Sequence, residues 1–409
     1  MRRMTLLVSA LVVAVVLVSA AAGSAGPGQA RWVIRDLGVL PGDSESVADD
    51  LNDRGQIVAR SRSMSGPESA LEVFLWDRGR VVHIASRDAS DGSEPMINER
   101  GMVAGTMLVS RNRHAFLWEN GKLSDLGILG VGEQASSWAS AINDRGEVVG
   151  GSSTRGLGYH PFLWRNGRMI DLGTLGEINA IGLHLKKGFY GGPGGAGSIN
   201  NRGQVAGSVT WGKSLVYVRA FLWQSGRIRE LPAPAGTWTS FTTDMNERGQ
   251  ILGVIEGADP NSRHAVIWHD GRITNLGVRD GAEGIINEQG QVLINQYPGN
   301  ATVRVTLWKN GHSRGIAPTG ASRTLAADIN DAGTAIVNTG DEVWNYTTFP
   351  YPDGTRAWVW RNGSAVRLPT LSGGTSTWAT AINNNNQIVG ASTTKDGKWH
   401  AVLWTLRSG

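Results

Sequence analysis

The sequence of 409 residues has no cysteine and little charge, and both deficits narrow what the protein can be. The absence of cysteine excludes disulfide scaffolds, thiolate zinc sites, cysteine nucleophiles and iron–sulfur clusters. Only 18% of the residues are charged whereas 40% are hydrophobic. The chain can therefore bury a large core, and wholesale disorder is excluded.

Long hydrophobic runs are also scarce, and the clearest one lies at the start of the chain. Arg2 and Arg3 precede an apolar run from Leu6 to Val18 that only Ser9 interrupts, and small residues follow it up to Ala25. This pattern predicts a signal peptide over residues 1–25 and a flexible start over residues 26–30. An uncleaved membrane anchor is the alternative; after cleavage we expect no membrane attachment.

The positive charge of the chain does not amount to a nucleic-acid site. Lysine and arginine number 39 against 35 acidic residues, and removal of residues 1–25 takes away two of the basic ones. The longest basic run is Lys186-Lys187, and no arginine stripe accompanies it. We therefore expect no nucleic-acid partner.

Phenylalanine and tyrosine are few, with 7 and 6 copies, whereas tryptophan occurs 16 times and half of these belong to one repeated position. A signature of the form Ile-Asn-x-x-Gly-x-hydrophobic occurs eight times, beginning at Leu51, Ile97, Ile142, Ile199, Met245, Ile286, Ile329 and Ile382. Each copy is followed by an apolar triplet that ends in Trp76, Trp118, Trp164, Trp223, Trp268, Trp308, Trp360 or Trp404. The mean spacing of these tryptophans is 46.9 residues.

Each copy reads as four short strands joined by tight turns. In the third copy we expect strands over residues 137–143, 147–150, 160–164 and 168–172. Asn143 can cap the backbone of the first turn, and Asn166-Gly167 is the favoured pair for a two-residue hairpin. Triplets such as Phe162-Leu163-Trp164 indicate a strand that is buried on both faces.

Four-stranded units that recur every 40 to 50 residues predict an all-β, eight-bladed β-propeller. The last copy stops soon after Trp404 without a fourth strand, whereas residues 32–38 match a fourth strand without the other three. We therefore expect the N-terminal strand to complete the C-terminal blade, so that residues 31–409 form a single propeller domain.

The sequence resembles the HAF repeat family of probable extracellular bacterial proteins. The resemblance rests on His114-Ala115-Phe116-Leu117-Trp118, on Asp125-Leu126-Gly127 and on the turn that begins at Ile142, and it covers the whole chain after residue 25. Copies six and seven depart from the His-Ala-Phe triplet. The resemblance implies secretion and a repeat fold, and it carries no established catalytic residues.

The longer connections lie on the face opposite the tight turns, and the spacing of the copies varies from 41 to 57 residues because of them. Function concentrates on variable loops held by a rigid scaffold. Two insertions, over residues 177–197 and 339–356, and three tryptophans before first strands supply the candidate ligand-binding residues, which are His184, Tyr190, Asp341, Trp344, Tyr346, Tyr351, Trp138, Trp238 and Trp378. The alternative is that these aromatic side chains only pack on the blades or plug the channel.

Three aspartates and four histidines invite a metal-site interpretation that the repeat does not favour. Asp50, Asp244 and Asp328 precede the signature in copies one, five and seven, and we expect each to be hydrogen-bonded separately. His114, His160, His264 and His400 occupy one repeat position, which indicates a role in the fold. We therefore expect no metal site and no cofactor.

These features favour a secreted, monomeric, non-enzymatic binding or scaffold protein that engages an extracellular glycan or protein through its variable-loop face. The alternative is a secreted hydrolase or lyase that acts on polysaccharide, for which two carboxylates or a basic group would have to converge. No nucleophile elbow, phosphate-binding loop or dinucleotide fingerprint supports an enzyme, and we assign no catalytic residue.

Overall fold

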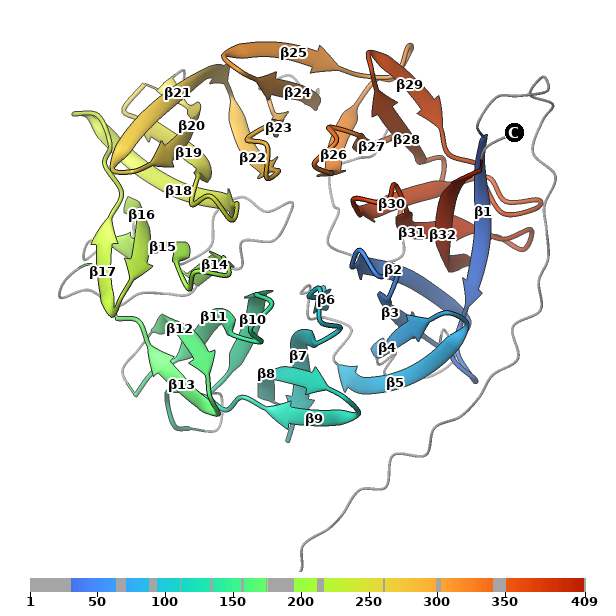
Figure 1. Cartoon of the computed structure of the whole chain (residues 1–409), viewed down its shortest axis with the longest axis horizontal. Coiled ribbons are helices and arrows are strands. Elements are labelled where there is room, and N and C mark those ends of the chain that lie inside the picture. The colour runs from blue at the N-terminus through green and yellow to red at the C-terminus, as the bar shows by residue number, and fades with distance from the viewer. Residues whose placement is uncertain are drawn as a thin grey trace, which may run out of the picture.

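Each copy of the repeat forms one four-stranded antiparallel sheet, and eight such sheets stand around a common axis as the blades of a β-propeller (Figure 1). The computed structural model describes residues 31–407 except 64–70, 88–93, 111, 133–134, 156–157, 174, 176–194, 212–216, 260–261, 299–302 and 341–350. The predicted signal peptide and flexible start lie outside the described residues. Among the described residues, no helix is both long and apolar enough to cross a membrane.

Blades 1 to 4 follow one another along the chain. Blade 1 contains β2 (Glu45–Leu51), β3 (Ile57–Arg62), β4 (Leu71–Asp77) and β5 (Arg80–Arg87). Blade 2 contains β6 (Met96–Ile97), β7 (Val103–Val109), β8 (Asn112–Glu119) and β9 (Lys122–Asp125). Blade 3 contains β10 (Ser137–Ile142), β11 (Val148–Ser153), β12 (Tyr159–Arg165) and β13 (Arg168–Asp171). Blade 4 contains β14 (Gly195–Ile199), β15 (Val205–Trp211), β16 (Tyr217–Gln224) and β17 (Arg227–Glu230).

Blades 5 to 8 continue the ring. Blade 5 contains β18 (Thr237–Met245), β19 (Ile251–Gly257), β20 (His264–His269) and β21 (Arg272–Arg279). Blade 6 contains β22 (Gly281–Ile286), β23 (Val292–Gln296), β24 (Arg304–Lys309) and β25 (His312–Ile316). Blade 7 contains β26 (Thr324–Ile329), β27 (Ala335–Thr339), β28 (Arg356–Arg361) and β29 (Ser364–Arg367). Blade 8 contains β30 (Thr377–Ile382), β31 (Ile388–Thr393) and β32 (Trp399–Arg407), to which β1 (Arg31–Gly38) is added.

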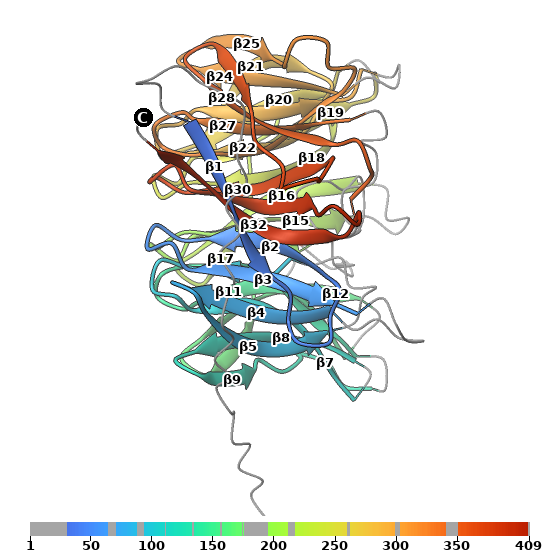
Figure 2. The same cartoon turned by 90° about the vertical axis from the view of Figure 1, so that its right-hand side faces the viewer.

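The ring closes as the sequence predicts. Strand β1 pairs antiparallel with β32 over its whole length, from Arg31 opposite Arg407 to Gly38 opposite Ala401. Figure 2 shows β1 running along the edge of the disc beside β32. The eight-bladed architecture is therefore confirmed, including the blade that combines strands from both ends of the chain.

The repeated tryptophan of the third strand packs between neighbouring blades. Trp404 is fully buried in a cluster with Val359 and Leu368 of blade 7, and its indole nitrogen donates a hydrogen bond of 2.8 Å to the backbone oxygen of Pro369. Trp268 makes the corresponding bond to Pro232 of blade 4. One side chain thus supplies both apolar burial and a polar contact between blades.

The tight turns after the first strands are joined into a circle. At seven of the eight blade junctions a turn asparagine makes the link, and between blades 4 and 5 the backbone N–H of Asn201 donates to the Glu247 carboxylate. In Asn143, Oδ1 accepts hydrogen bonds from two backbone nitrogens of its own turn, and Nδ2 donates to the backbone oxygen of Asn200 in the next blade at 3.1 Å. Equivalent donations to the next blade are made by Asn52, Asn98, Asn246, Asn287, Asn330 and Asn383. This face of the disc is therefore a continuous structural belt.

Candidate functional site

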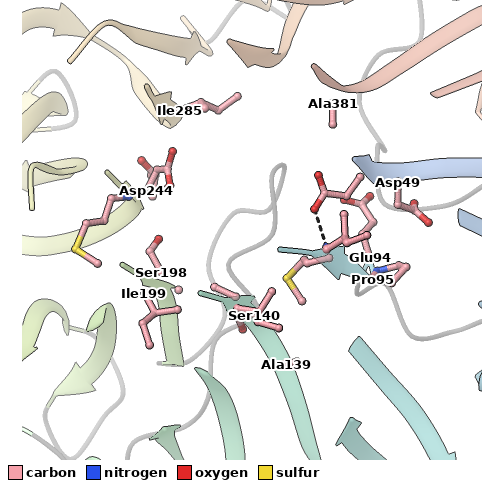
Figure 3. Close-up of a pocket in the computed structure, with 18 of the residues that line it drawn as sticks. Asp49, Glu94, Pro95, Ala139, Ser140, Ser198, Ile199, Asp244, Ile285 and Ala381 are labelled. Atoms are coloured by element: carbon pink, nitrogen blue, oxygen red, sulfur yellow. Dashed lines mark hydrogen bonds between the residues drawn. The ribbon is translucent and has the colours of Figure 1, made fainter. Parts of the chain in front are cut away.

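The first strands of the blades surround a cavity of about 350 Å³ in the central channel (Figure 3). The residue that precedes each signature lines this cavity in seven of the eight blades, namely Asp50, Met96, Ala141, Ser198, Asp244, Ile285 and Ala381. In every blade the first strand pairs only with the second strand, so its inner edge faces the channel. The cavity is therefore bordered by backbone edges as well as by side chains.

The aspartates of the channel connect neighbouring blades. The carboxylate of Asp50 accepts hydrogen bonds from the backbone nitrogens of Leu51, in its own blade, and Ile97, in blade 2, at 2.9 and 3.0 Å. Asp244 and Asp328 make the same two contacts from blades 5 and 7. Separate hydrogen bonding of the three aspartates, as predicted from the sequence, is confirmed. No three His, Asp or Glu side chains of the described residues are placed to share a metal ion.

A buried group of charges lies beside the cavity in blades 1 and 2. The guanidinium of Arg60 holds the carboxylate of Asp49 with Nε at 2.8 Å from Oδ2, and both side chains are buried. Burial alone would lower the pKa of Arg60, but the charge and hydrogen bonds of Asp49 outweigh it and raise that pKa above its ordinary value. Glu94 lies 3.9 Å from the same guanidinium, and 30% of its side chain is exposed.

Sequence reasoning missed this group, although a signal was present. At the position of Asp49 the other copies have Pro, Ser, Gly, Thr, Gly, Ala and Thr, and at the position of Arg60 none of them has a charged residue. Copy one alone departs from the repeat at both places. The pair of Asp49 and Arg60 is therefore peculiar to blade 1, and Asp49 lines the cavity.

Two of the three tryptophans proposed as a ligand platform and one loop tyrosine are packed inside the molecule, which agrees with the alternative interpretation that these side chains pack on the blades or plug the channel. Tyr351 is buried and stacks on Trp378, with ring centroids 4.6 Å apart, and its edge contacts Trp399. Trp138 is 5% exposed and packs beside Tyr159, at 5.1 Å between centroids. Burial of these large apolar rings stabilises the folded protein, whereas leaving them exposed to water would forgo that stabilisation.

Of the remaining predicted ligand-binding residues, one has an exposed side chain and five lie outside the described residues. Trp238 is 51% exposed, and its backbone oxygen accepts a hydrogen bond from the Arg219 guanidinium. The five outside the described residues are His184, Tyr190, Asp341, Trp344 and Tyr346.

The histidines of the repeat pair with aspartates of the outermost strand. His114 Nδ1 lies 2.9 Å from Asp125, and the same pairing joins His160 to Asp171. In blade 8 the pair spans the closure, with His400 at 3.0 Å from Asp36 of β1. Each of these aspartates also accepts the backbone N–H of a following glycine. The interpretation of these three histidines as part of the fold is confirmed.

No protein-family model matches the sequence, and no relative is found among curated proteins. The HAF resemblance therefore stays a prediction. The fold is similar to that of a prolyl endopeptidase, with 10% identity, a TM-score of 0.52, and coverage of 89% of this chain and 55% of the other. A puromycin-hydrolysing peptidase of Mycobacterium tuberculosis gives 11% identity, a TM-score of 0.51, and coverage of 87% and 59%.

A third similar structure is the β-propeller domain of the Trilobed protease from Pyrococcus furiosus, with 9% identity, a TM-score of 0.49, and coverage of 80% and 96%. The chain spans little more than half the length of the two longer peptidases. The sequence-based prediction of a glycan- or protein-binding scaffold, with a polysaccharide hydrolase or lyase as its alternative, is wrong by this comparison. The two longer similar structures are peptidases, and the tryptophan platform that supported a glycan ligand is largely buried.

Proposed function

We propose that this chain is the peptide-receiving propeller of a peptidase system, and that its central cavity accepts the amino-terminal end of a peptide. The observation that carries the proposal is the cavity of about 350 Å³ with acidic side chains in its wall. The two longer peptidases with a similar fold extend well beyond the matched region. A hydrolytic unit would therefore act together with this propeller.

The charges beside the cavity favour a cationic group. Asp49 and Arg60 neutralise each other in their buried pair, so the group that they form with Glu94 has a net charge of −1. Glu94 is half-buried at the cavity wall, where the local dielectric is lower than in water and a positive charge is attracted more strongly. The terminal ammonium of a peptide is a compact cation that suits such a position.

The backbone around the cavity favours an extended chain behind that ammonium. The inner edges of the first strands carry N–H and C=O groups on the channel side, of which the N–H groups of Ile97, Ile286 and Ile382 already donate to the channel aspartates. Peptides bind to such edges through main-chain hydrogen bonds that do not depend on their sequence. Hydroxyls of Ser140 and Ser198 in the wall add further hydrogen-bonding groups. These features support recognition of the peptide terminus rather than of particular side chains.

The test compares tetra-alanine with its N-acetylated form by isothermal titration calorimetry. We expect the wild-type protein to bind free tetra-alanine and to bind the acetylated peptide at least tenfold more weakly. Glu94→Gln should weaken binding of the free peptide by about tenfold, which corresponds to roughly 1.4 kcal/mol. The matched control Glu119→Gln, an exposed residue of β8, should have no effect. Equal binding of the two peptides, or no binding, would overturn the proposal.

The predicted signal peptide favours a location of this propeller outside the cytoplasm. If residues 1–25 direct export, the propeller meets its peptides outside the cytoplasm, as the HAF resemblance also implies. Secretion is part of the proposal and rests on the sequence alone.

A further inference from the structure

Five blades carry a hydrogen-bonded or ion-paired couple of one basic and one acidic side chain at one repeat position on their outer two strands. Besides the three His–Asp pairs, Arg219 pairs with Glu230 in blade 4 at 3.1 Å. Blade 1 reverses the order, with Glu72 in the histidine position and His83 in the aspartate position at 2.6 Å. In these five blades the repeat thus follows one rule: a basic side chain lies beside an acidic one at this position. The residue types and their order differ between blades.

Blades 5, 6 and 7 break this rule, and always on the acidic side. In blade 5 the residue that takes the place of the aspartate is Asn275. In blade 6 the corresponding residue is Gly315, and Arg304 occupies the histidine position. In blade 7 both positions are basic, Arg356 and Arg367. Partial burial and the charge of Arg356 lower the pKa of Arg367.

The loss of these carboxylates leaves a strongly basic surface, which we call the basic arc. It consists of the outer two strands of blades 5 to 7, residues 264–279, 304–316 and 356–367. These ranges contain eight lysines and arginines and a single carboxylate, Asp270, whereas the equivalent strands of blades 2 to 4 contain seven and four. All eight cationic side chains are exposed except Arg356, which is half-buried.

The basic arc is continuous across the blades. Strands β21, β25 and β29 follow one another along the rim of the disc (Figure 1). The guanidinium of Arg314 in blade 6 lies over the ring of Trp360 in blade 7, 5.3 Å from its centroid. Blades 6 and 7 are therefore linked by a cation that stays on the surface.

We propose that the basic arc docks an extended acidic segment of a partner polypeptide. Seven of the eight cations are arginines, whose planar guanidinium binds carboxylates in two-point contacts. The outermost strands β21, β25 and β29 each pair with one neighbour only, so their outer edges can add a strand. Val366, 51% exposed in β29, offers an apolar contact to a peptide side chain.

The shape of the rim argues against a membrane as the occupant. The rim is convex, so a flat bilayer would touch it along only a short part of the arc, whereas a flexible chain can follow all three blades. Charges on edge strands also prevent edge-to-edge aggregation. That need applies equally to all eight blades and does not account for a surplus confined to three of them.

The repeat itself supplies a variant that lowers the net charge of the basic arc by four and is compatible with the fold. Asn275→Asp, Gly315→Asp and Arg367→Glu restore the acidic partner in blades 5, 6 and 7. The side chain of Asn275 already accepts the backbone N–H of Gly277, as the aspartates do. A Cβ at Gly315 meets nothing within 4 Å. Each of the three positions can therefore take the carboxylate that the other blades carry.

The matched control makes the same change in net charge outside the basic arc. It combines Arg168→Glu with Arg227→Glu, at exposed positions on the outer strands β13 and β17 of blades 3 and 4. A difference between this control and the triple variant therefore reports the position of the charges and not their sum.

Binding is measured by fluorescence anisotropy with a labelled peptide of alternating glutamate and valine. We expect the wild-type protein to bind it with an affinity that falls as salt is added. The triple variant should bind roughly tenfold more weakly and the control variant within about twofold of wild type. Thermal unfolding checks that both variants fold, and Arg367→Glu alone serves if the triple variant does not.

Three outcomes overturn the proposal. An equal loss in the control variant would show that net charge, and not the basic arc, governs binding. Inorganic polyphosphate of matched charge that binds as tightly as the peptide would show that no strand is added. Sedimentation with phosphatidylserine vesicles in the absence of peptide binding would make the surface a membrane site. The proposal does not depend on the function of the central cavity, so either can fail alone.

Discussion

Most residues that pack between or within blades match the repeat, such as the turn asparagines, whereas the buried charged residues Asp49 and Arg60 depart from it. The capping role of the turn asparagines could be predicted, because an Asn side chain and the backbone two residues on lie within one turn. Their donation to the next blade could not, because it depends on the distance between blades. The pair of Asp49 and Arg60 was missed for a different reason: its two residues lie on separate strands of blade 1, 11 positions apart in the sequence, and the pairing of β2 with β3 brings them together.

One largely desolvated carboxyl, that of Glu283, should make the stability of the protein depend on pH. Burial raises the pKa of Glu283 to about 7, although hydrogen bonds with Asn295 and Tyr297 oppose the shift. The folded protein therefore holds this proton more tightly than the unfolded chain, whose glutamate has a pKa of 4.5. The resulting stabilisation is complete below pH 4.5 and is lost as the pH rises through 7, by about 3 kcal/mol.

Substitution of Glu283 by Gln, which stays neutral, should remove this dependence. We expect urea unfolding to show wild-type protein losing more stability between about pH 5 and pH 8 than Glu283→Gln does. Glu119→Gln, at an exposed position, should retain the wild-type profile. Identical profiles for wild type and Glu283→Gln would show that the carboxyl is ionised across this range.

At the scale of the strand and the blade, the sequence pattern predicts most of the structure. In blade 3 the expected strands at 137–143, 147–150, 160–164 and 168–172 are found at 137–142, 148–153, 159–165 and 168–171. Trp238 lies inside β18 instead of before it. Trp378 lies inside β30 instead of before it, and Trp138 lies inside β10, within the strand expected at 137–143. The sequence left the burial of Trp138 and Trp378 open as one of two alternatives, because the rings that cover them come from other parts of the fold, as Tyr351 does for Trp378.

The stability of the hairpin turns should depend on the positive φ angles of their two central residues. Asn166 and Gly167 both have positive φ, 51° and 78°, as a two-residue hairpin of this type requires. A Cβ at Gly167 meets no atom within 4 Å, so Gly167→Ala changes conformational preference without a clash. We expect a loss of about 1 kcal/mol in the free energy of unfolding, measured in urea.

Gly315 provides the control for that measurement. It lies in β25 with an ordinary φ and has equal space for a methyl group, so Gly315→Ala should leave stability unchanged or raise it by up to about 1 kcal/mol. A similar loss at both glycines would mean that the left-handed turn is not the cause.

At the scale of the whole molecule, the number of blades and the closure of the ring follow from the sequence, whereas the function does not. The last copy lacks a fourth strand and residues 32–38 match one, so the two features together predict that the ends of the chain share a blade and close the ring. The central cavity is built from the residue before the signature and its neighbours in seven blades, and the mixture of Asp, Met, Ala, Ser and Ile at that position does not mark it as a site. The variable loop lengths predict a binding site on the variable-loop face, whereas the acidic cavity lies in the channel.

Photo-crosslinking tests most directly whether the channel is where a peptide binds. Tetra-alanine that carries a benzophenone at its carboxyl end is irradiated with the wild-type protein, and the labelled fragments are mapped by mass spectrometry. The account predicts labels on the first strands that border the cavity, above all β6, β10 and β14, and their loss on N-acetylation of the peptide. Labels confined to the rim, or unchanged by acetylation, would contradict it.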